Sequence, residues 1–401
     1  MKVLIVFGTR PEAIKMAPII EVMARRPEVF DLRICATAQH REMLDNVLPL
    51  FDIQPDYDLD LMRENQTLAE LTADILGAID PVICQQEPDW VLVQGDTTTA
   101  MAAALAGYYR HVAIGHVEAG LRTYDKLQPF PEEVNRRTTG ILADIHFAPT
   151  EQAQANLLRE GVDKRRILVT GNTVIDALLQ VVGREYDFTT GPLAQIPFDK
   201  RILLVTAHRR ENFGEPLQAL CRAIEMISRR HSEDIHVVYP VHLNPQVRNP
   251  VHGSLAGLSN VTLLEPLDYA SFVHLMNRSY MVLTDSGGLQ EEAPSLGKPV
   301  LVLRNKTERP EAVQAGTARL VGTKTERIVA ETESLLNDST LYEQMANAAN
   351  PYGDGHAAER ICSALVMTTD EKSGLRTEES PSLPGDKLSR AVSDLHAIVD
   401  S

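Results

Sequence analysis

The chain has 401 residues, of which 44% are hydrophobic and 23% charged, a composition typical of a globular protein with about two domains. Its formal net charge of -16 argues against nucleic acid or an anionic membrane surface as a partner, so we expect neither. No apolar run approaches the roughly 20 residues of a membrane-spanning helix. Four scattered cysteines form no C-x-x-C pair, so the sequence predicts neither a disulfide framework nor a metal site.

The first apolar run, residues 2–7, predicts a strand buried on both faces of a parallel sheet. It is typical of a strand rather than a signal peptide, and we therefore expect a cytoplasmic protein. A turn and a helix follow, which place Arg10 and Lys15 at the carboxyl edge of the sheet, where open α/β sheets bind ligands. Ordinary surface charge is the alternative. The turn lacks G-x-G-x-x-G, so no dinucleotide cofactor is expected.

Three carboxylates follow predicted strands in the first half of the chain. Asp96 comes after the strand at 90–94, Glu118 after the strand at 111–115, and Glu132 in the loop beyond. Carboxylates that share one site raise one another's pKa, which makes them candidates for general acid or base catalysis. Each could instead be paired locally, and Asp96 could be a helix N-cap. Their recurrence at one sheet edge favours a shared site.

A second strand and helix series follows a connection predicted at residues 186–199, which contain three glycine or proline residues and little periodicity. The strand at 202–206 leads into His208, Arg209 and Arg210. A lone histidine is usually structural, but two arginines beside His208 at a strand end favour contact with an anion. The loop after the strand at 300–303 ends at Arg309 and adds positive charge.

Residues 282–298, with the sequence VLTDSGGLQEEAPSLGK, form the most informative stretch of the second half. An apolar strand breaks at small residues and enters a predicted helix at Leu289. Backbone N–H groups at such a helix start bind anions, and glycines let a phosphate approach closely. Glu291 and Glu292 could accept hydrogen bonds from sugar hydroxyls. The alternative is an ordinary helix start with Ser286 as its N-cap.

The sequence therefore predicts two domains, at residues 1–171 and 172–356, and a helix over 357–369 that crosses back to the first. Residues from about 370 to 385 are polar and rich in Ser, Glu and Pro, which predicts a flexible linker. Residues 386–400 carry apolar side chains at helical spacing and predict a short amphipathic helix.

From residue 1 to about 368 the chain resembles the non-hydrolysing UDP-N-acetylglucosamine 2-epimerases of bacteria. The resemblance is carried by motifs in the same order: GTRPEAIKMAPI, TAQHREML, QGDTTTA, GHVEAGLR, PEEVNRR, TGNTVIDAL, HRRENFG, YPVHLNP, LTDSGGLQEEAPSLGKPVLVLR, TERPEA and NPYGDG. It implies an α/β fold with two doubly wound Rossmann-like domains facing across a cleft, the GT-B glycosyltransferase architecture. Because members of the family are homodimers, it also implies a homodimer.

The resemblance assigns roles to individual residues. Contacts to uridine diphosphate fall on Arg10, His208, Phe272, Ser286, Gly287 and Glu292, with Ser286 and Gly287 at the phosphate, Glu292 at the ribose and Phe272 near the uracil. The sugar and catalytic positions fall on Lys15, Asp96, Glu118, Glu132 and Arg309. Gln39 and His40 match part of an activator site of some members, but Asn65 replaces an arginine that certain members carry.

The implied reaction interconverts UDP-N-acetylglucosamine (UDP-GlcNAc) and UDP-N-acetylmannosamine (UDP-ManNAc), which supplies units for bacterial surface polysaccharides. UDP is eliminated to give 2-acetamidoglucal and then adds back, with the proton delivered to the other face of C2. Two faces need two proton carriers, and the sequence leaves open which carboxylate serves which face. The alternatives are a hydrolysing relative, a retaining glycosyltransferase of the same fold and a non-catalytic nucleotide-sugar sensor.

Overall fold

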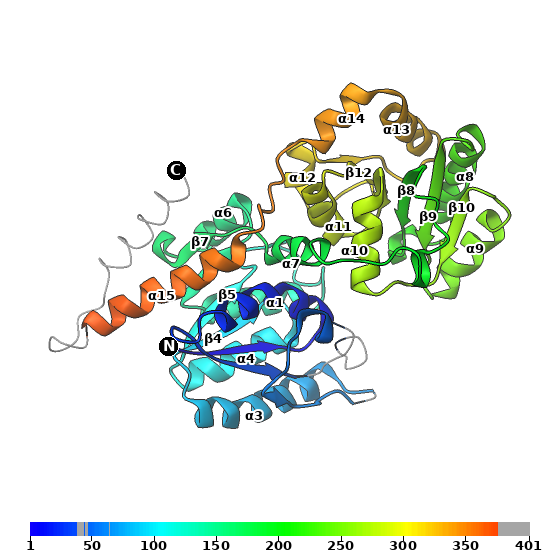
Figure 1. The fold of residues 1–401 in the computed structure, drawn as a ribbon. Helices are drawn as coiled ribbons and strands as arrows, with labels where there is room; N and C mark the ends of the chain where they lie inside the picture. The colour runs from blue at the N-terminus through cyan, green and yellow to red at the C-terminus, as the bar shows by residue number, and fades with distance from the viewer. Residues whose placement is uncertain (38–43, 45–46, 64, 376–401) are drawn as a thin grey trace. The chain divides into compact units, whose positions relative to one another are not determined.

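The computed structural model describes residues 1–37, 44, 47–63 and 65–375, with side chains through residue 368. The chain divides into two compact units (Figure 1). Unit 1 comprises Met1–Ala177 and the chain from Tyr352 onward, and unit 2 comprises Leu178–Pro351. Each unit contains one parallel sheet with helices packed on it, so the predicted α/β class is confirmed.

Unit 1 contains a seven-stranded parallel sheet in the order β3-β2-β1-β4-β5-β6-β7. Its strands are β1 (Lys2–Phe7), β2 (Asp31–Ala36), β3 (Tyr57–Asp58), β4 (Trp90–Gln94), β5 (Ala113–Val117), β6 (Ile145–Ala148) and β7 (Ile167–Val169). Its helices are α1 (Arg10–Ala24), α3 (Leu68–Gln86), α4 (Thr98–Tyr109), α5 (Glu132–Leu142), α6 (Glu151–Arg159), the first half of α7 (Thr173–Val182) and α15 (Ala357–Leu375). Helix α1 packs against α15, and α4 packs against both α3 and α5 (Figure 1).

Unit 2 contains a six-stranded parallel sheet in the order β10-β9-β8-β11-β12-β13. Its strands are β8 (Arg201–Thr206), β9 (Ile235–Pro240), β10 (Val261–Leu264), β11 (Met281–Thr284), β12 (Val300–Val302) and β13 (Ala318–Leu320). The elements around it are α8 (Glu215–Arg230), α9 (Pro245–Leu255), α10 (Tyr269–Arg278), α11 (Gly287–Glu292), α12 (Pro310–Gln314), α13 (Thr325–Asn337), α14 (Ser339–Ala346) and the short 3-10 turns η4 (Arg210–Asn212) and η5 (Ala293–Leu296).

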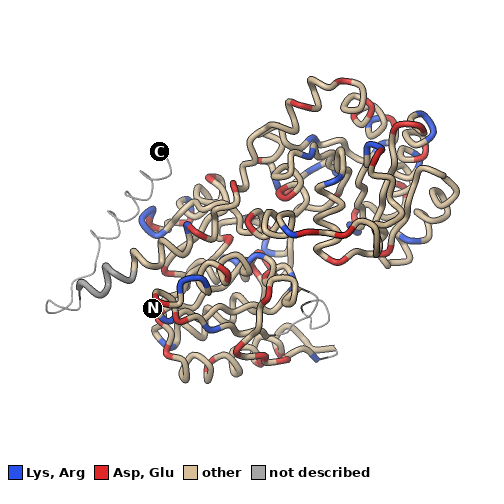
Figure 2. The backbone as a smooth tube through the Cα atoms, viewed as in Figure 1, with Lys and Arg blue, Asp and Glu red and all other residues tan. Residues whose placement is uncertain are grey.

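The central strands are buried on both faces, as their continuous apolar sequences predict. The last five residues of β1 are almost inaccessible to solvent, and the same holds for the last five of β8 apart from Thr206. Parallel sheets covered by helices on both sides need such strands. Acidic and basic residues are interspersed along the backbone of each unit (Figure 2). None of the helices in the described part of the chain is long and apolar enough to span a membrane.

In each sheet the strand order reverses between two central neighbours, β1 and β4 in unit 1 and β8 and β11 in unit 2. At such a switch point the loops leave the two strands in opposite directions, and ligands bind at the carboxyl ends there. The loops after β1 and β4 carry Arg10 and Asp96. The loops after β8 and β11 carry His208 and Ser286. The topology therefore places predicted site residues of each unit beside its switch point.

Two short strands and one helix end differ from the sequence-based expectation. Strands β3 and β13 have only two and three residues and give no clear apolar run. Helix α15 continues to Leu375, into the stretch from about 370 that was predicted to be a linker. Residues 172–177 group with unit 1, whereas the predicted boundary follows residue 171. The predicted terminal helix at 386–400 lies outside the described residues.

The start of α15 is held by Asp176 of α7, whose Oδ1 accepts the backbone N–H of Ala358 at 2.8 Å. The other oxygen of Asp176 is buried and has no hydrogen-bond partner among the described residues. Burial, the largest cause, raises the pKa of Asp176 to about 6. The carboxylate form is therefore costly inside the folded protein.

This raised pKa predicts a pH-dependent stability. A carboxyl group of this kind contributes fully below its unfolded pKa of 3.8, and its contribution is lost as the pH rises through about 6. Asp176→Asn keeps an acceptor for Ala358 but cannot ionise. We expect this variant to exceed the wild type in unfolding free energy by up to about 3 kcal/mol above pH 6, and to match it near pH 4. Urea unfolding at both pH values measures this, and an equal effect at both would contradict it.

Candidate active site

The loop after β1 is anchored by a buried carboxylate, Glu12. Thr9 and Glu12 form a capping box at the start of α1, in which Glu12 Oε2 accepts the N–H groups of Thr9 at 2.8 Å and Gly8 at 3.1 Å. Glu12 Oε1 accepts the hydroxyl of Thr97, the N-cap of α4, at 2.7 Å. One carboxylate thus joins the two loops at the switch point, directly beside Arg10. Burial raises the pKa of Glu12, although these hydrogen bonds lower it.

Glu118 lies at the centre of a polar cluster at the carboxyl end of β5. Lys15 Nζ donates to both oxygens of Glu118, at 2.7 and 2.6 Å, and Asn172 Nδ2 donates to Oε1 at 3.0 Å. Gln94 Nε2 also donates to Oε2. The φ angle of Glu118 is 61°, in the left-handed region that non-glycine residues rarely adopt. Strain of this kind is concentrated at functional sites, where surrounding contacts hold it.

Asp96 lies close enough to the other predicted carboxylates to interact with them electrostatically. Burial is the main cause that raises the pKa of Asp96, and Glu118 and Glu132 raise it further. Arg136 and Lys15 act in the opposite direction. The structure therefore brings together four of the predicted residues, Lys15, Asp96, Glu118 and Glu132, in unit 1.

Helix α5 supplies the remaining contacts to Asp96. Arg136 forms an ion pair with the Asp96 carboxylate, and Asn135 Nδ2 donates to the Asp96 carbonyl at 3.0 Å. Glu132 is the first residue of α5, and its Oε2 is buried without a hydrogen-bond partner among the described residues. The interpretation of Asp96 as an N-cap is wrong, because Thr97 caps α4.

A buried histidine supports the same loop. His116 of β5 is bonded through Nε2 to the carbonyl of Gly95 at 2.7 Å. Burial lowers the pKa of His116 to about 4, so the ring is neutral near pH 7 and Nε2 donates. Gly95 has a φ of 70°, which a glycine adopts at low cost. The contact fixes the turn that leads into Asp96.

In unit 2, the loop after β8 presents His208 against Asp285, the first residue after β11. Their Nδ1 and Oδ1 atoms are 3.7 Å apart, and the His208 ring stacks on His242 with centroids 5.6 Å apart. Burial, the largest cause, lowers the pKa of His208, whereas Asp285 raises it. Burial and the facing carboxylate therefore act on the pKa of His208 in opposite directions.

Helix α11 begins at Gly287 rather than at the predicted Leu289, with Ser286 as its N-cap. The Ser286 side chain forms no capping hydrogen bond with the described chain, while its N–H donates to Thr284 Oγ1 at 2.9 Å. A β-carbon built at Gly287 would lie 3.5 Å from the Arg209 guanidinium. A cation and a glycine backbone thus adjoin at this loop. The helix has only six residues, so its dipole contributes less than that of a full-length helix.

The two adjacent glutamates of α11 have different environments. Glu291 is 3% exposed and forms an ion pair with Arg309, and its carbonyl accepts Asn350 Nδ2 at 2.8 Å. Glu292 remains partly exposed, as does Phe272 on α10. Of the two glutamates, Glu292 is thus the more accessible to a ligand. Arg309 is held by Glu291 and by a bond from its N–H to Thr307 Oγ1 at 3.0 Å.

Several partners of the predicted residues were missed at the sequence level: Glu12, Gln94, Arg136, Asn172 and Asp285. Glu12 had a readable signal, because T-x-x-E before an apolar run is a capping box. The other four contact residues that are distant in the sequence, and no local motif indicates them. Gln39 and His40 lie outside the described residues, and Asn65 has a left-handed φ of 59°.

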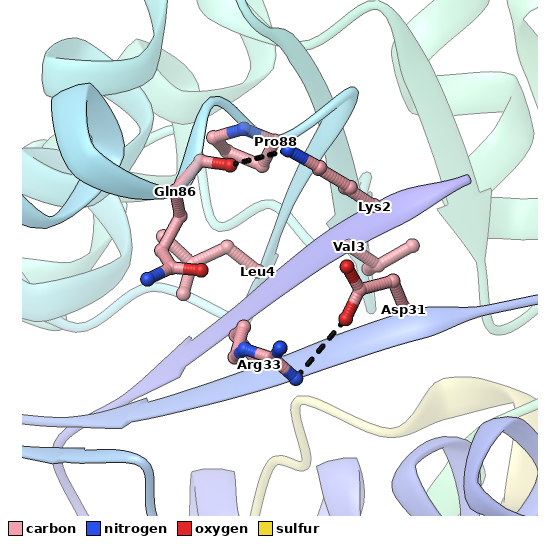
Figure 3. A pocket seen from close by; sticks show the side chains of 7 residues that line it. All are labelled: Lys2, Val3, Leu4, Asp31, Arg33, Gln86 and Pro88. Carbon is pink, nitrogen blue, oxygen red and sulfur yellow. Dashed lines mark hydrogen bonds and ion pairs between the residues drawn. The ribbon is translucent and has the colours of Figure 1, made fainter. Parts of the chain in front are cut away.

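A small surface recess of unit 1 lies away from these residues (Figure 3). It is lined by Lys2, Val3, Leu4, Asp31, Arg33, Gln86 and Pro88. Asp31 pairs with Arg33 at 3.0 Å, and Lys2 Nζ donates to the Gln86 carbonyl at 3.3 Å. Five of these residues come from the starts of β1 and β2, and Gln86 and Pro88 come from the end of α3 and the segment before β4. The recess thus lies at the edge opposite the carboxyl ends, so we assign it no ligand.

Two parallel doubly wound sheets, each with charged loops at its switch point, define a two-domain α/β protein of the GT-B-like class. Residues 23–366 match the family model described as UDP-N-acetylglucosamine 2-epimerase. The chain belongs to the UDP-N-acetylglucosamine 2-epimerase family, as the resemblance of its motifs predicts.

Individual relatives cover nearly the whole chain. The UDP-N-acetylglucosamine 2-epimerases of Yersinia pestis and Escherichia coli K12 are 57% and 56% identical to it, over 91% of this chain and 98% of each relative. The crystal structure of UDP-GlcNAc 2-epimerase from Neisseria meningitidis, bound to UDP-GlcNAc, is 48% identical with a TM-score of 0.81. That similarity covers 91% of this chain and 100% of the Neisseria chain.

The position of Glu12 generates a prediction for the loops. Glu12→Ala leaves two buried backbone N–H groups and the Thr97 hydroxyl without their acceptor, each at a cost of about 1–3 kcal/mol. We therefore expect a loss of at least about 3 kcal/mol in unfolding free energy, measured by urea titration. Glu12→Gln keeps one acceptor oxygen and should lose less. Equal stability of the two variants would show that these hydrogen bonds are not what holds the loops.

Proposed function

We propose that this protein interconverts UDP-GlcNAc and UDP-ManNAc by inverting C2 of the sugar. Family membership supports the substrate class, because relatives over 50% identical bear the name UDP-N-acetylglucosamine 2-epimerase. The observation that carries the proposal is the coupled group of Asp96, Glu118 and Glu132 in unit 1. Three carboxylates beside Lys15 exceed what binding a neutral sugar ring requires.

The proposed route is elimination followed by re-addition. The C2 proton of UDP-GlcNAc is not next to a carbonyl and is only feebly acidic. Breaking the C1–O bond gives UDP and 2-acetamidoglucal, with loss of the C2 proton, and UDP then adds back after a proton is delivered to the opposite face. Charge grows on the diphosphate as the bond breaks, so groups that bind it more tightly in the transition state accelerate the step.

We assign the diphosphate to Arg10, His208, Ser286 and Gly287. His208 and the adjacent Arg209 supply positive charge in unit 2, and the glycine at the start of α11 lets an oxygen approach the backbone. Glu292, which remains partly exposed, would accept the ribose hydroxyls, and Phe272 would lie at the uracil. Arg309, which its ion pair with Glu291 orients, would contact the sugar.

We assign proton transfer to the carboxylates of unit 1. Glu118 forms an ion pair with Lys15, and its carboxylate is suited to stabilise positive character at C1 or to accept a proton. Burial raises the pKa of Asp96, and a raised pKa favours the role of a general acid. Glu132 has a buried oxygen without a partner among the described residues. Two of these three serve the two faces of C2.

We further propose a homodimer in the cytoplasm whose product enters surface polysaccharides. All four cysteines of the chain are unpaired, which fits a reducing compartment.

Isotope exchange tests the reaction. In D2O we expect proton NMR to show deuterium at C2 of both UDP-GlcNAc and UDP-ManNAc, with UDP and the glycal as trace by-products. A hydrolysing enzyme would instead release free N-acetylmannosamine, and a glycosyltransferase would need an acceptor and leave C2 protonated. Epimerisation with no deuterium at C2 would exclude the elimination route.

Glu118→Gln tests the carboxylate cluster. Loss of the charge weakens the contact with Lys15 and lowers the pKa of Asp96, because Glu118 raises it. We expect kcat to fall by about 100-fold or more, while the Kd for UDP, measured by calorimetry, changes little. Glu331→Gln, which alters a surface ion pair with Arg319, is the matched control and should leave both unchanged. Turnover of Glu118→Gln within about two-fold of wild type would contradict the assignment.

A further inference from the structure

Asp285 is fully buried at the switch point of unit 2 and holds the neighbouring loop by three hydrogen bonds. Its Oδ2 accepts the backbone N–H groups of His208 and Arg209 and the side-chain amide of Asn212, each at 2.9 Å. The loop after β8 is therefore built around this one oxygen. A carboxylate that collects three donors fixes the position of the backbone on which His208 stands.

The other oxygen of Asp285 faces the imidazole. Oδ1 is buried and has no hydrogen-bond partner among the described residues, and it lies 3.7 Å from His208 Nδ1. His242 covers one face of the ring, at an interplanar angle of 12°. The His208 side chain is still 44% exposed. Nδ1 thus points to a buried carboxylate, and Nε2, on the opposite side of the ring, is directed elsewhere.

The charges around His208 act in opposite directions on its pKa. Burial lowers the pKa of His208 most, and His242 and Arg209 lower it further. Asp285 raises it. Glu308 lies 3.4 Å from Arg209 Nη1 and is engaged with that guanidinium. His242 accepts the N–H of Asn244 through Nδ1 at 3.0 Å, so when neutral it carries its proton on Nε2.

We propose that Asp285 is a positioning residue for His208: Oδ2 fixes the backbone of the loop and Oδ1 faces Nδ1, so that Nε2 is directed to the diphosphate of the substrate. This inference rests on the proposed function of His208 at the diphosphate. A carboxylate behind an imidazole fixes its tautomer and stabilises its cation, and the buried site strengthens both effects. Asp285 itself touches no substrate. The stabilisation that Asp285 provides through His208 increases as negative charge develops on the leaving diphosphate.

Asp285→Asn tests this arrangement, because asparagine keeps an oxygen for the three donors and removes the charge. We expect the pKa of His208, followed by NMR of the ring, to fall. We expect kcat at neutral pH to drop by about ten-fold or more, and the alkaline limb of the kcat/KM profile to move to lower pH. Partial recovery of activity at lower pH follows, since His208 is protonated there. A purely structural defect would move none of these pH profiles.

Asp338→Asn is the matched control. Asp338 caps α14 in the same unit by accepting the N–H of Leu341, and this variant should leave the pKa of His208 and kcat unchanged. An unchanged or raised pKa of His208 in Asp285→Asn would overturn the proposal.

A measurement on the wild type keeps the test independent of variant folding. Nitrogen-15 NMR should show the neutral His208 ring protonated on Nδ1, and a ring protonated on Nε2 would overturn the proposal. His208→Asn separates this inference from the proposed function. Full activity of that variant would remove His208 from the reaction, whereas the coupling of Asp285 to His208 would still be measured by the ring pKa.

Discussion

A buried carboxylate that joins two loops at a switch point is the constraint on which the candidate site residues of each unit depend. In unit 1 it is Glu12, which binds the loop after β1 and the cap of α4 after β4. In unit 2 it is Asp285, which follows β11 and binds the loop after β8. At these points the loops leave the two strands in opposite directions. A carboxylate can accept several N–H groups at once and so joins the two loops.

The two units balance charge in opposite ways. In unit 1 the carboxylates Asp96, Glu118 and Glu132 are brought together by Lys15 and Arg136, each paired with one of them. In unit 2 the basic Arg209 adjoins Gly287, and the buried carboxylate of Asp285 lies behind His208. Asymmetry of this kind suits a reaction in which negative charge leaves with a phosphate while a proton moves at carbon.

The sequence predicts well what depends on local pattern. Long apolar runs such as β1 and β8 identify the buried strands, and their ends locate the loops that carry Arg10, Asp96 and His208. It predicts poorly what depends on pairing across the fold. Glu118 meets Lys15 across 103 residues and Asp285 meets His208 across 77, and no local periodicity encodes such contacts. Arg309 pairs with Glu291 because Glu291 lies on the buried side of α11. Two adjacent glutamates in the sequence do not indicate which of them is buried.

The histidines show how burial and neighbours that are distant in the sequence change the pKa of an imidazole ring. His116 and His146 face each other on neighbouring strands of unit 1, and burial lowers their pKa values to about 4 and about 3. Both rings are therefore neutral near pH 7, although His116 lies two residues from Glu118. His208 is also partly buried but faces Asp285. Burial makes His116 a neutral support, whereas the carboxylate facing His208 raises its pKa against the larger effect of burial, so the same residue type meets different electrostatic environments in the two units.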